Sequence, residues 1–423
     1  MASAEQHDNQ SPSPRKPREG TDIFTKHTLI VPTFNRPAFL KQITTHFTGI
    51  RKNMNLLVLD SSCPEVIEKN SAMLRTLIPS PKHIIYPHDI PPATKLAAGL
   101  REVKTPYVSI CGDDDLVFPD GLQEALDFLD SHPEHACAHG LYLNLVEDNF
   151  NVHITIEYSG GSIEAVHPGW RIFQLLEKYE ALFYAVFRTE DLARIFAEVS
   201  QIPSLHYQEL FLAVATLIKG KAHRFPRFYA VRRSCPPAQP NRDHWESHSW
   251  FGENRVEYLQ HYLAYRDALL KFYDSNIQSS SSERDFFSKV LDMTHTMYFS
   301  IGFPNYARFI LENTWPSDLM GVYRRDILKT IEPGRLKHPN PKIGTIEALL
   351  QRLCQRLSRV LAMKLPEQDH AATLAELNKE IQSSSKIPWT CHLPSELLWL
   401  AENSDFRATY QELCQYLDHG DHG

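Results

Sequence analysis

The sequence predicts an α/β fold, in which a mostly parallel β-sheet is flanked by helices and followed by an all-α C-terminal region. Two observations in the first half of the chain support the sheet. Short apolar runs without alternation, typical of strands buried on both faces, are separated by amphipathic stretches. Polar or proline-containing turns follow these runs. A third observation concerns the rest of the chain, where the pattern is almost entirely helical from about Trp250.

Alternating strands and helices are predicted as far as residue 128. The strands are expected at 28–31, 55–60, 83–86 and 107–111, and the helices at 38–47, 65–77, 93–103 and 119–128. Pro119 suits the first turn of the last helix, where the missing N–H of proline is tolerated. Strands and helices that alternate at this spacing form right-handed βαβ units, so the strands lie parallel in one sheet. Such sheets bind ligands outside the carboxyl ends of their strands.

The second half of the predicted sheet domain is less regular. Between about 135 and 235, helices are expected at 170–179 and 207–218, with a buried strand at 182–188. The segment 232–243 contains three prolines and is expected to be a loop. Further helices are expected at 256–273, 284–299, 346–363 and 367–381. We therefore divide the chain into a disordered leader (1–22), an α/β sheet domain (23–240) and a helical C-terminal region (241–423).

Composition excludes several classes of protein. The formal net charge of −7 argues against a nucleic-acid-binding protein, which would usually carry a basic excess. The seven cysteines include no CxxC pair, so they indicate neither a disulfide framework nor a zinc ribbon and suit a reducing compartment. The N-terminus lacks the apolar core of a signal peptide, and no run approaches the roughly 18 apolar residues of a transmembrane helix.

These features predict a cytoplasmic protein without a transmembrane segment. The leader carries a short basic cluster, Arg15, Lys16 and Arg18. A solvated tail is the favoured interpretation, but the cluster leaves open a peripheral contact with acidic lipid on the inner face of the membrane.

Three adjacent carboxylates, Asp113, Asp114 and Asp115, directly follow the fourth predicted strand. Adjacent carboxylates repel one another and raise one another's pKa unless a cation is bound. Mg²⁺ and Mn²⁺ prefer such oxygen ligands and commonly share them with substrate phosphates. A solvated acidic turn before the next helix is the alternative. The position at the end of a βαβ strand favours a site for Mn²⁺ or Mg²⁺.

Asp60 ends the second predicted strand and is followed by Ser61 and Ser62. A carboxylate at this edge can accept a hydrogen bond from a nucleobase or from a ribose hydroxyl. The alternative is a turn in which the Asp60 side chain bonds to the backbone ahead of the next helix. The position at the sheet edge favours nucleotide binding.

Residues 27 to about 130 resemble the family 2 glycosyltransferases, whose GT-A fold is a Rossmann-type sheet. TLIVPTFNRP resembles the first-strand signature of that family, LLVLDSS its nucleoside-binding second strand, and YVSICGDDDLVFPDGL its DxD segment. The combination of PTFNRP and DDD is most similar to a bacterial subgroup of unassigned acceptor. YAVFRTEDL and YQELFLAVATLIKGK fit the same subgroup more loosely, and the resemblance ends near Arg233.

The resemblance implies roles for residues at the sheet edge. It places Asp115 as the direct metal ligand, with Asp113 as a second ligand or facing the sugar and Asp114 orienting both. The other residues implied to line the nucleotide-sugar pocket are Pro32, Thr33, Asn35, Arg36, Asp60 and Lys95. One departure concerns Ala97, which replaces an asparagine that contacts the donor in the family. Lys95 either faces the diphosphate or covers the sheet with its aliphatic stem.

The family also uses an acidic residue near the start of a later helix as general base. The resemblance places Glu209, in the sequence YQEL, at that position, although the common Glu-Asp pair is Gln-Glu here. The alternative is a first-turn glutamate that only favours the helix dipole. Glu190 and Asp191 are the next acidic candidates along the chain.

Histidines and aromatic residues supply weaker candidates. His244 and His248 are four residues apart, which places both on one face of a helix, and either could complete the metal shell. Surface positions without a ligand are the favoured interpretation of this pair. Trp170, Tyr184 and Trp245 are candidates for stacking on a sugar, but burial in the core is favoured for each.

Together these features predict a metal-dependent glycosyltransferase of hexosyltransferase type. It would move a sugar from a nucleotide-sugar to an acceptor hydroxyl with inversion, and the acceptor could be a glycan, a lipid-linked molecule or a protein. The helical region would complete the acceptor cleft or mediate homo-oligomerisation. Two rivals are a non-catalytic nucleotide-sugar-binding scaffold and a nucleotidyltransferase. The latter would normally carry a glycine-rich basic loop after the first strand, unlike PTFNRP.

Overall fold

A mixed ten-stranded sheet forms the centre of the molecule. The structure is a computed structural model that describes residues 23–50, 54–148, 150–156, 158, 160–177, 179–233, 255–302 and 370–419. The main strand order is β10-β7-β6-β8-β4-β1-β2-β3, and β9 lies beside β6 and β5. The predicted helix at 346–363, the leader and the pair His244 and His248 lie outside the described residues.

The predicted βαβ series is confirmed in the first third of the chain. Its strands are β1 (His27–Thr33), β2 (Asn55–Asp60), β3 (Lys82–Ile85) and β4 (Tyr107–Ile110). Its helices are α1 (Pro37–Ile50), α2 (Pro64–Arg75), α3 (Pro92–Leu100) and α4 (Pro119–Ser131). β1 pairs in parallel with both β2 and β4, and β2 pairs in parallel with β3. Each of these helices begins with proline, whose fixed φ suits the first helical position.

The remaining strands introduce the antiparallel pairs. They are β5 (Leu116–Val117), β6 (His135–Asp148), β7 (Asn151–Ile156), β8 (Val186–Arg188) and β9 (Lys221–Arg233). β8 runs antiparallel to both β4 and β6, which are therefore parallel to each other. The strand expected at 182–188 forms only over its last three residues, because Leu182–Ala185 makes a turn closed by a backbone hydrogen bond of 3.0 Å.

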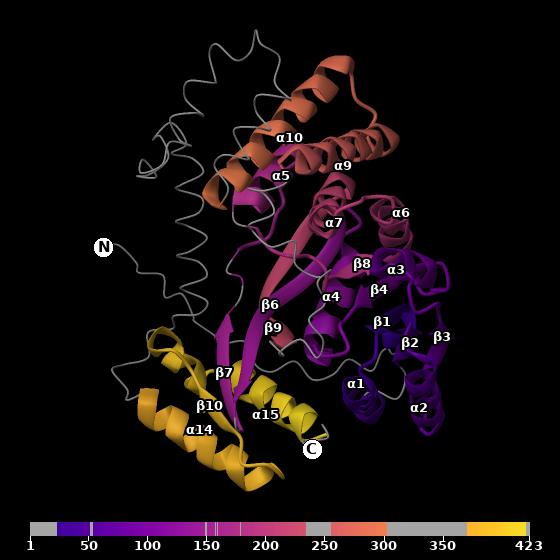
Figure 1. Ribbon diagram of the computed structural model, residues 1–423. Helices are drawn as coiled ribbons and strands as arrows, with labels where there is room; N and C mark the ends of the chain where they lie inside the picture. Colours follow the sequence, from indigo (N-terminus) through magenta and orange to yellow (C-terminus); the bar gives the residue numbers. More distant parts are fainter. Residues whose placement is uncertain are drawn as a thin grey trace, which may run out of the picture.

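Helices cover both faces of the sheet (Figure 1). One hydrophobic core includes residues from α3, α5 (Pro168–Glu177), α6 (Thr189–Val199), α7 (Leu205–Lys219), α9 (Arg255–Asn276) and α10 (Ser281–Gly302). The other includes residues from α1, α2, α4, α14 (His370–Ser384), the 3-10 helix η3 (Ser395–Glu402) and α15 (Ser404–Asp418). Alternating residues of β1 point into opposite cores. Ile30 belongs to the first core, and Leu29 and Val31 belong to the second. The helix α6 was not predicted.

The C-terminal segment returns to the sheet domain (Figure 1). Its strand β10 (Thr390–His392), which was not predicted, pairs in parallel with β7. The side-chain amide of Gln42 on α1 donates to the backbone carbonyl of Tyr416 on α15 at 2.6 Å. The last helix is thus packed beside the first one of the βαβ series. None of the helices in the described ranges has both the length and the apolar composition needed to cross a bilayer.

Candidate active site

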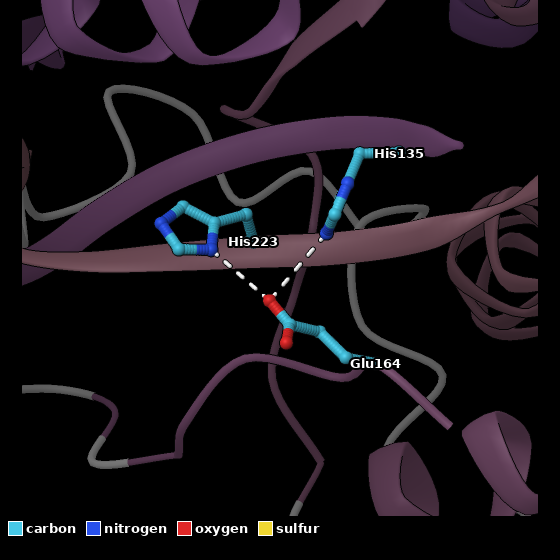
Figure 2. A group of neighbouring side chains, drawn as sticks. All are labelled: His135, Glu164 and His223. Atoms are coloured by element: carbon cyan, nitrogen blue, oxygen red, sulfur yellow. Dashed lines mark hydrogen bonds and ion pairs between the residues drawn. The ribbon is translucent and has the colours of Figure 1, made fainter. Parts of the chain in front are cut away.

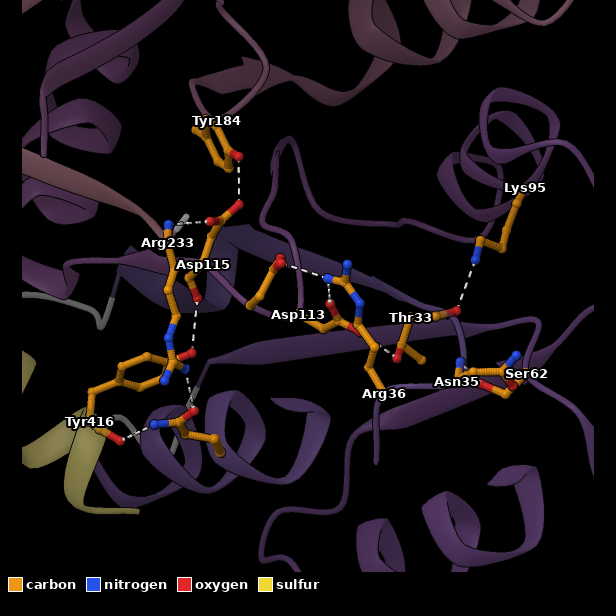
Figure 3. A network of polar contacts seen from close by, with 12 residues as sticks. Thr33, Asn35, Arg36, Ser62, Lys95, Asp113, Asp115, Tyr184, Arg233 and Tyr416 are labelled. Atoms are coloured by element: carbon orange, nitrogen blue, oxygen red, sulfur yellow. Dashed lines mark hydrogen bonds and ion pairs between the residues drawn. The ribbon is translucent and has the colours of Figure 1, made fainter. Parts of the chain in front are cut away.

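The carboxyl ends of β1, β2 and β4 meet at one edge of the sheet. The register pairs Thr33 with Asp60, and the hydrogen bond from the Cys111 amide to the Ile30 carbonyl continues the β1–β4 pairing toward the acidic run. The hydroxyl of Thr33 donates to Oδ2 of Asp113 at 2.6 Å (Figure 3). The chain therefore brings the predicted residues of the first and fourth strands into contact.

Arg36 lies over the first two carboxylates of the run. Its Nη1 is 3.3 Å from Oδ1 of Asp113 and 2.5 Å from Oδ2 of Asp114. Asp113 is buried, whereas the side chain of Asp114 is partly exposed. One guanidinium therefore faces two carboxylates, and the third has a different set of neighbours.

Asp115 is buried and receives hydrogen bonds from neutral groups (Figure 3). The Tyr184 hydroxyl donates to Oδ2 at 2.5 Å, and the backbone amide of Arg233 donates to Oδ1 at 2.9 Å. These donors hold the carboxylate in a defined orientation. They do not supply the positive charge that would normally accompany a buried carboxylate.

The buried carboxylates have raised pKa values. Burial and repulsion by Asp114 raise the pKa of Asp113 to about 7, against the lowering effects of Thr33 and Arg36. Burial and the charge of Asp114 also raise the pKa of Asp115 to about 6, against the hydrogen bonds from Tyr184 and Arg233. A dication would favour the ionised form of both groups. Three adjacent carboxylates, two of them in contact with a single guanidinium, keep an excess of negative charge, which Mn²⁺ or Mg²⁺ would offset.

Asp60 is fully buried, and its contacts are with the protein. Its Oδ1 accepts from the Ser62 amide at 2.9 Å, while Oδ2 lies 2.8 Å from Nδ2 of Asn70 and 3.1 Å from Nε2 of His83. Burial alone would raise the pKa of Asp60, but the hydrogen bonds from His83, Asn70 and Ser62 outweigh it and lower the pKa to about 2. The carboxylate therefore links the turn after β2 to α2 and β3.

Asn35 and Lys95 connect the turn after β1 with the turn after β2. Asn35 has a positive φ of 57°, and its Oδ1 accepts from the Cys63 amide at 2.8 Å. The ammonium of Lys95 is buried and donates to the Thr33 carbonyl at 3.0 Å and to the Ser61 hydroxyl at 2.9 Å. Burial lowers the pKa of Lys95 to about 8, partly offset by Asp60 and Asp113. Lys95 thus braces the two turns, a role beyond the two considered from the sequence, which were facing the diphosphate and covering the sheet with its stem.

Pro32, the remaining predicted pocket residue, is the partly buried penultimate residue of β1. It follows the fully buried Val31 and precedes Thr33, and it pairs with Leu59 of β2. Its backbone therefore belongs to the same edge as the acidic run.

Glu209 lies in the second turn of α7, because that helix begins at Leu205 rather than near Tyr207. The glutamate is exposed, and its Oε1 accepts a hydrogen bond of 2.8 Å from the Tyr179 hydroxyl. Tyr179 and Tyr184 both belong to the connection between α5 and β8. This connection therefore contacts Glu209 through one hydroxyl and Asp115 through the other.

The two other acidic candidates lie elsewhere. Glu190 and Asp191 begin α6, which directly follows β8, and the Thr189 amide donates to the Pro106 carbonyl at the start of β4. They are therefore at the opposite edge of the sheet from the acidic run. Glu190 pairs with Arg194, and Asp191 pairs with Lys219 at 2.9 Å.

Several residues of the site were not predicted from sequence. Tyr184 was expected to be a core aromatic, yet its hydroxyl reaches Asp115. Arg233 was assigned to a loop, but it ends β9 and extends its guanidinium to Gln42 at 3.0 Å and Glu147 at 2.8 Å. Burial was also the wrong expectation for Trp170, which is 48% exposed.

The C-terminal helix α15 reaches this site through Tyr416. Its hydroxyl donates to the backbone carbonyl of Asp115 at 3.3 Å, and the ring is buried (Figure 3). No sequence signal distinguished this tyrosine, because it lies 301 residues from its partner and follows an ordinary helical pattern.

We expect Tyr416→Phe to lower the free energy of unfolding by about 1 kcal/mol, the typical net contribution of a hydrogen bond. The measurement is urea denaturation. The matched control is Tyr142→Phe, because the buried Tyr142 hydroxyl has no hydrogen-bond partner among the described residues. Equal stability losses in the two variants would mean that the Tyr416 bond does not stabilise the fold.

Comparisons with known proteins give one family match and several distant structural likenesses. Residues 28–196 match the model of glycosyl transferase family 2. No curated protein matches the chain. One similar solved structure is that of residues 1–349 of TarS from S. aureus in complex with UDP-GlcNAc. Its sequence is 15% identical to this chain, and the structural alignment has a TM-score of 0.46. The alignment covers 73% of this chain and 90% of that one.

A second solved structure is the mannosyltransferase PcManGT from Pyrobaculum calidifontis, in complex with GDP-Man and Mn²⁺. It is 15% identical with a TM-score of 0.38, covering 83% of this chain and 92% of that one. The matched family segment runs from β1 into α6 and includes the acidic run. Residues 28–196, which hold the acidic run, are thus the part of this chain that is similar to glycosyl transferase family 2.

Proposed function

We propose that this glycosyltransferase moves a hexosyl group from a nucleotide-sugar to an acceptor hydroxyl, with inversion and with Mn²⁺ or Mg²⁺ as cofactor. The observation that carries the proposal is the buried carboxylate run at the carboxyl edge of the sheet. Asp113 and Asp115 have raised pKa values there because they are buried beside Asp114. This is the edge at which open α/β sheets bind their ligands.

The acidic run would hold the cation through Asp115 and Asp113. A divalent cation held here would neutralise charge on the leaving diphosphate. Tyr184 and the Arg233 amide orient Asp115, and Thr33 orients Asp113. Arg36 contacts Asp113 and Asp114, and we propose that it exchanges these contacts for donor phosphate oxygens when the cation arrives.

Glu209 is our proposed general base. It is exposed, so an acceptor hydroxyl can reach its carboxylate, and the Tyr179 hydroxyl orients Oε1 at 2.8 Å. A base that removes the acceptor proton while the leaving group departs from the opposite face of the sugar gives inversion. We assign an indirect role to three further residues, which hold the turns that border the proposed nucleotide pocket without contacting the nucleotide. They are Asp60, Asn35 and Lys95.

The experiment that tests the proposal is a thermal-shift screen of nucleoside diphosphates with and without Mn²⁺, followed by donor turnover. A ligand at 100 times its dissociation constant stabilises the protein by about 2.7 kcal/mol. We expect the shift to require the cation and to disappear with a chelator. With the matching nucleotide-sugar, we expect release of free nucleoside diphosphate and, with acceptor, a product of inverted anomeric configuration by NMR.

The same assay separates the two rival functions. Binding of a nucleotide-sugar without cleavage, in the presence of a broad acceptor panel, would indicate a non-catalytic scaffold. Pyrophosphate release from a nucleoside triphosphate would indicate a nucleotidyltransferase. The glycine-rich basic loop of that class is absent from the turn after β1, which reads Phe34-Asn35-Arg36.

We propose that the C-terminal region supports the catalytic domain. The contacts of α15 with Gln42 and with the Asp115 carbonyl couple it to the acidic run. The acceptor would enter on the side of Glu209 and Tyr179, where α10 contributes Tyr298, whose ring centroid lies 5.7 Å from that of Tyr179. Self-association through the helical region remains part of the proposal.

A further inference from the structure

A second cluster, of side-chain types that can bind a metal, lies at the other edge of the sheet. His135 begins β6, His223 lies near the start of β9, and Glu164 comes from the segment between β7 and α5 (Figure 2). The backbone carbonyl of His135 accepts a hydrogen bond of 3.2 Å from Arg188, which pairs with Tyr107 at the start of β4. Asp113 follows the end of that same strand, so the two clusters are at opposite edges.

The three side chains converge on one point (Figure 2). Oε1 of Glu164 is 3.4 Å from Nε2 of His135 and 3.2 Å from Nδ1 of His223. All three ligand atoms lie within 4.8 Å of one another. Ligands at the usual zinc distances of about 2.0–2.2 Å are separated by about 3.4 Å in a tetrahedral site, so two of the three separations already have that value.

Neighbouring groups hold the ligands in place. The ring of Phe128 on α4 stacks on His223, with centroids 3.7 Å apart, and meets His135 edge-on at 4.8 Å. Backbone hydrogen bonds of 2.8 and 3.0 Å between Ile163 and Ala222 tie the residue before Glu164 to β9. The cluster is thus built on two strands and a backbone bridge rather than on surface side chains alone.

The second nitrogen of His135 lies near a carboxylate but is not hydrogen-bonded to it. This imidazole is buried, and its Nδ1 makes no hydrogen bond within the described residues, with Oε1 of Glu134 at 3.4 Å. Histidines bound to a metal usually direct their other nitrogen to a carboxylate or carbonyl. A small shift of the exposed Glu134 side chain would complete that contact.

We propose that His135, Glu164 and His223 bind a zinc ion that fastens the segment before α5 to the sheet. Two imidazoles and one carboxylate suit Zn²⁺ better than Mg²⁺ or Mn²⁺, which prefer oxygen donors. Three protein ligands leave one position for water. The competing arrangement is metal-free, with the Glu164 carboxylate shared as hydrogen-bond acceptor by both imidazoles and Ser162 3.3 Å from Nδ1 of His223.

Titration of the metal-stripped full chain with Zn²⁺ by calorimetry tests the proposal, with Co²⁺ as a spectroscopic probe. Excess Mg²⁺ is present throughout to occupy the oxygen site at Asp113–Asp115. We expect one zinc equivalent, a higher melting temperature, and the intense visible absorption of tetrahedral Co²⁺. These measurements need no substrate, so failure of the proposed transferase function would not affect them.

The variants are Glu164→Gln and His223→Gln, with His153→Gln as control. Glu164 is exposed and His223 only partly buried, so both variants should fold. We expect zinc affinity to fall about 100-fold or more, since loss of an outer-shell partner alone costs about 10–100-fold. The control removes one member of the exposed stacked pair His153 and His392, whose ring centroids are 4.8 Å apart. Unchanged zinc affinity in both cluster variants, loss in the control, or no zinc equivalent would overturn the proposal.

Discussion

Replacing Asp115 with asparagine should abolish metal-dependent nucleoside diphosphate binding and, with it, sugar transfer. The side chain is buried at the carboxyl end of β4, and its pKa is raised to about 6 by burial and by Asp114, despite hydrogen bonds from Tyr184 and Arg233. An amide in this position keeps the shape but removes the charge that offsets a dication. Calorimetric titration with nucleoside diphosphate and Mn²⁺ measures the loss.

The matched control is Asp127→Asn. Asp127 is an exposed aspartate on α4, the helix that follows the acidic run, so the same chemical change is made outside the site. We expect this variant to bind nucleotide as the unmodified protein does. Circular dichroism and melting of Asp115→Asn show whether the variant folds and keeps its stability. A folded Asp115→Asn variant that binds nucleotide and Mn²⁺ with unchanged affinity would exclude Asp115 as the metal ligand.

The sheet and the position of the acidic run could be predicted because their signals are local. Runs such as Leu56–Leu59 are apolar at every position, as strands buried on both faces require, and a proline begins each helix of the series. Once parallel order follows from the βαβ pattern, the ends of β1, β2 and β4 must share an edge. Asp113 and Thr33 could therefore be placed near each other without a structure.

The roles of individual side chains at that edge could not be predicted in the same way. Asp60 and Lys95 occupy the expected positions, but both are buried and bonded to protein groups. Whether a polar residue after a strand faces a ligand or braces a turn depends on contacts with other turns. Sequence position does not contain that information.

Contacts between segments that are far apart in the sequence could not be predicted either. Tyr416 meets Asp115 only because α15 packs beside α1, and β10 joins the sheet only through its pairing with β7. A three-residue strand has too little pattern to be recognised, and a tyrosine in an amphipathic helix is usually core. The residues proposed to bind zinc could not be grouped from the sequence for the same reason. Glu164 is 59 residues from His223 and 29 from His135, and the three share no motif.

The proposed role of Glu209 as general base can be tested with a single substitution. We expect Glu209→Gln to reduce transfer by roughly 10²–10⁴-fold, the usual effect of losing a general base. Glutamine keeps an oxygen that can accept the Tyr179 hydrogen bond, so the local geometry should persist. Donor and metal affinity should stay the same, because the substitution is outside the acidic run. Initial rates and calorimetry on one preparation separate these quantities.

The control for this variant is Glu190→Gln, which makes the same change at the start of α6, on the opposite edge of the sheet. If Glu209 were only a surface residue of α7, its substitution would change the free energy of unfolding by no more than about 0.5 kcal/mol and leave turnover intact. Glu209 lies in the second turn of α7, whereas the stabilising effect of the helix dipole on an acidic side chain falls off within the first turn. The dipole therefore contributes little to stability through Glu209. Full activity in Glu209→Gln would therefore exclude it as the base. A loss in Glu190→Gln instead would move the acceptor to the other edge and contradict the proposed site.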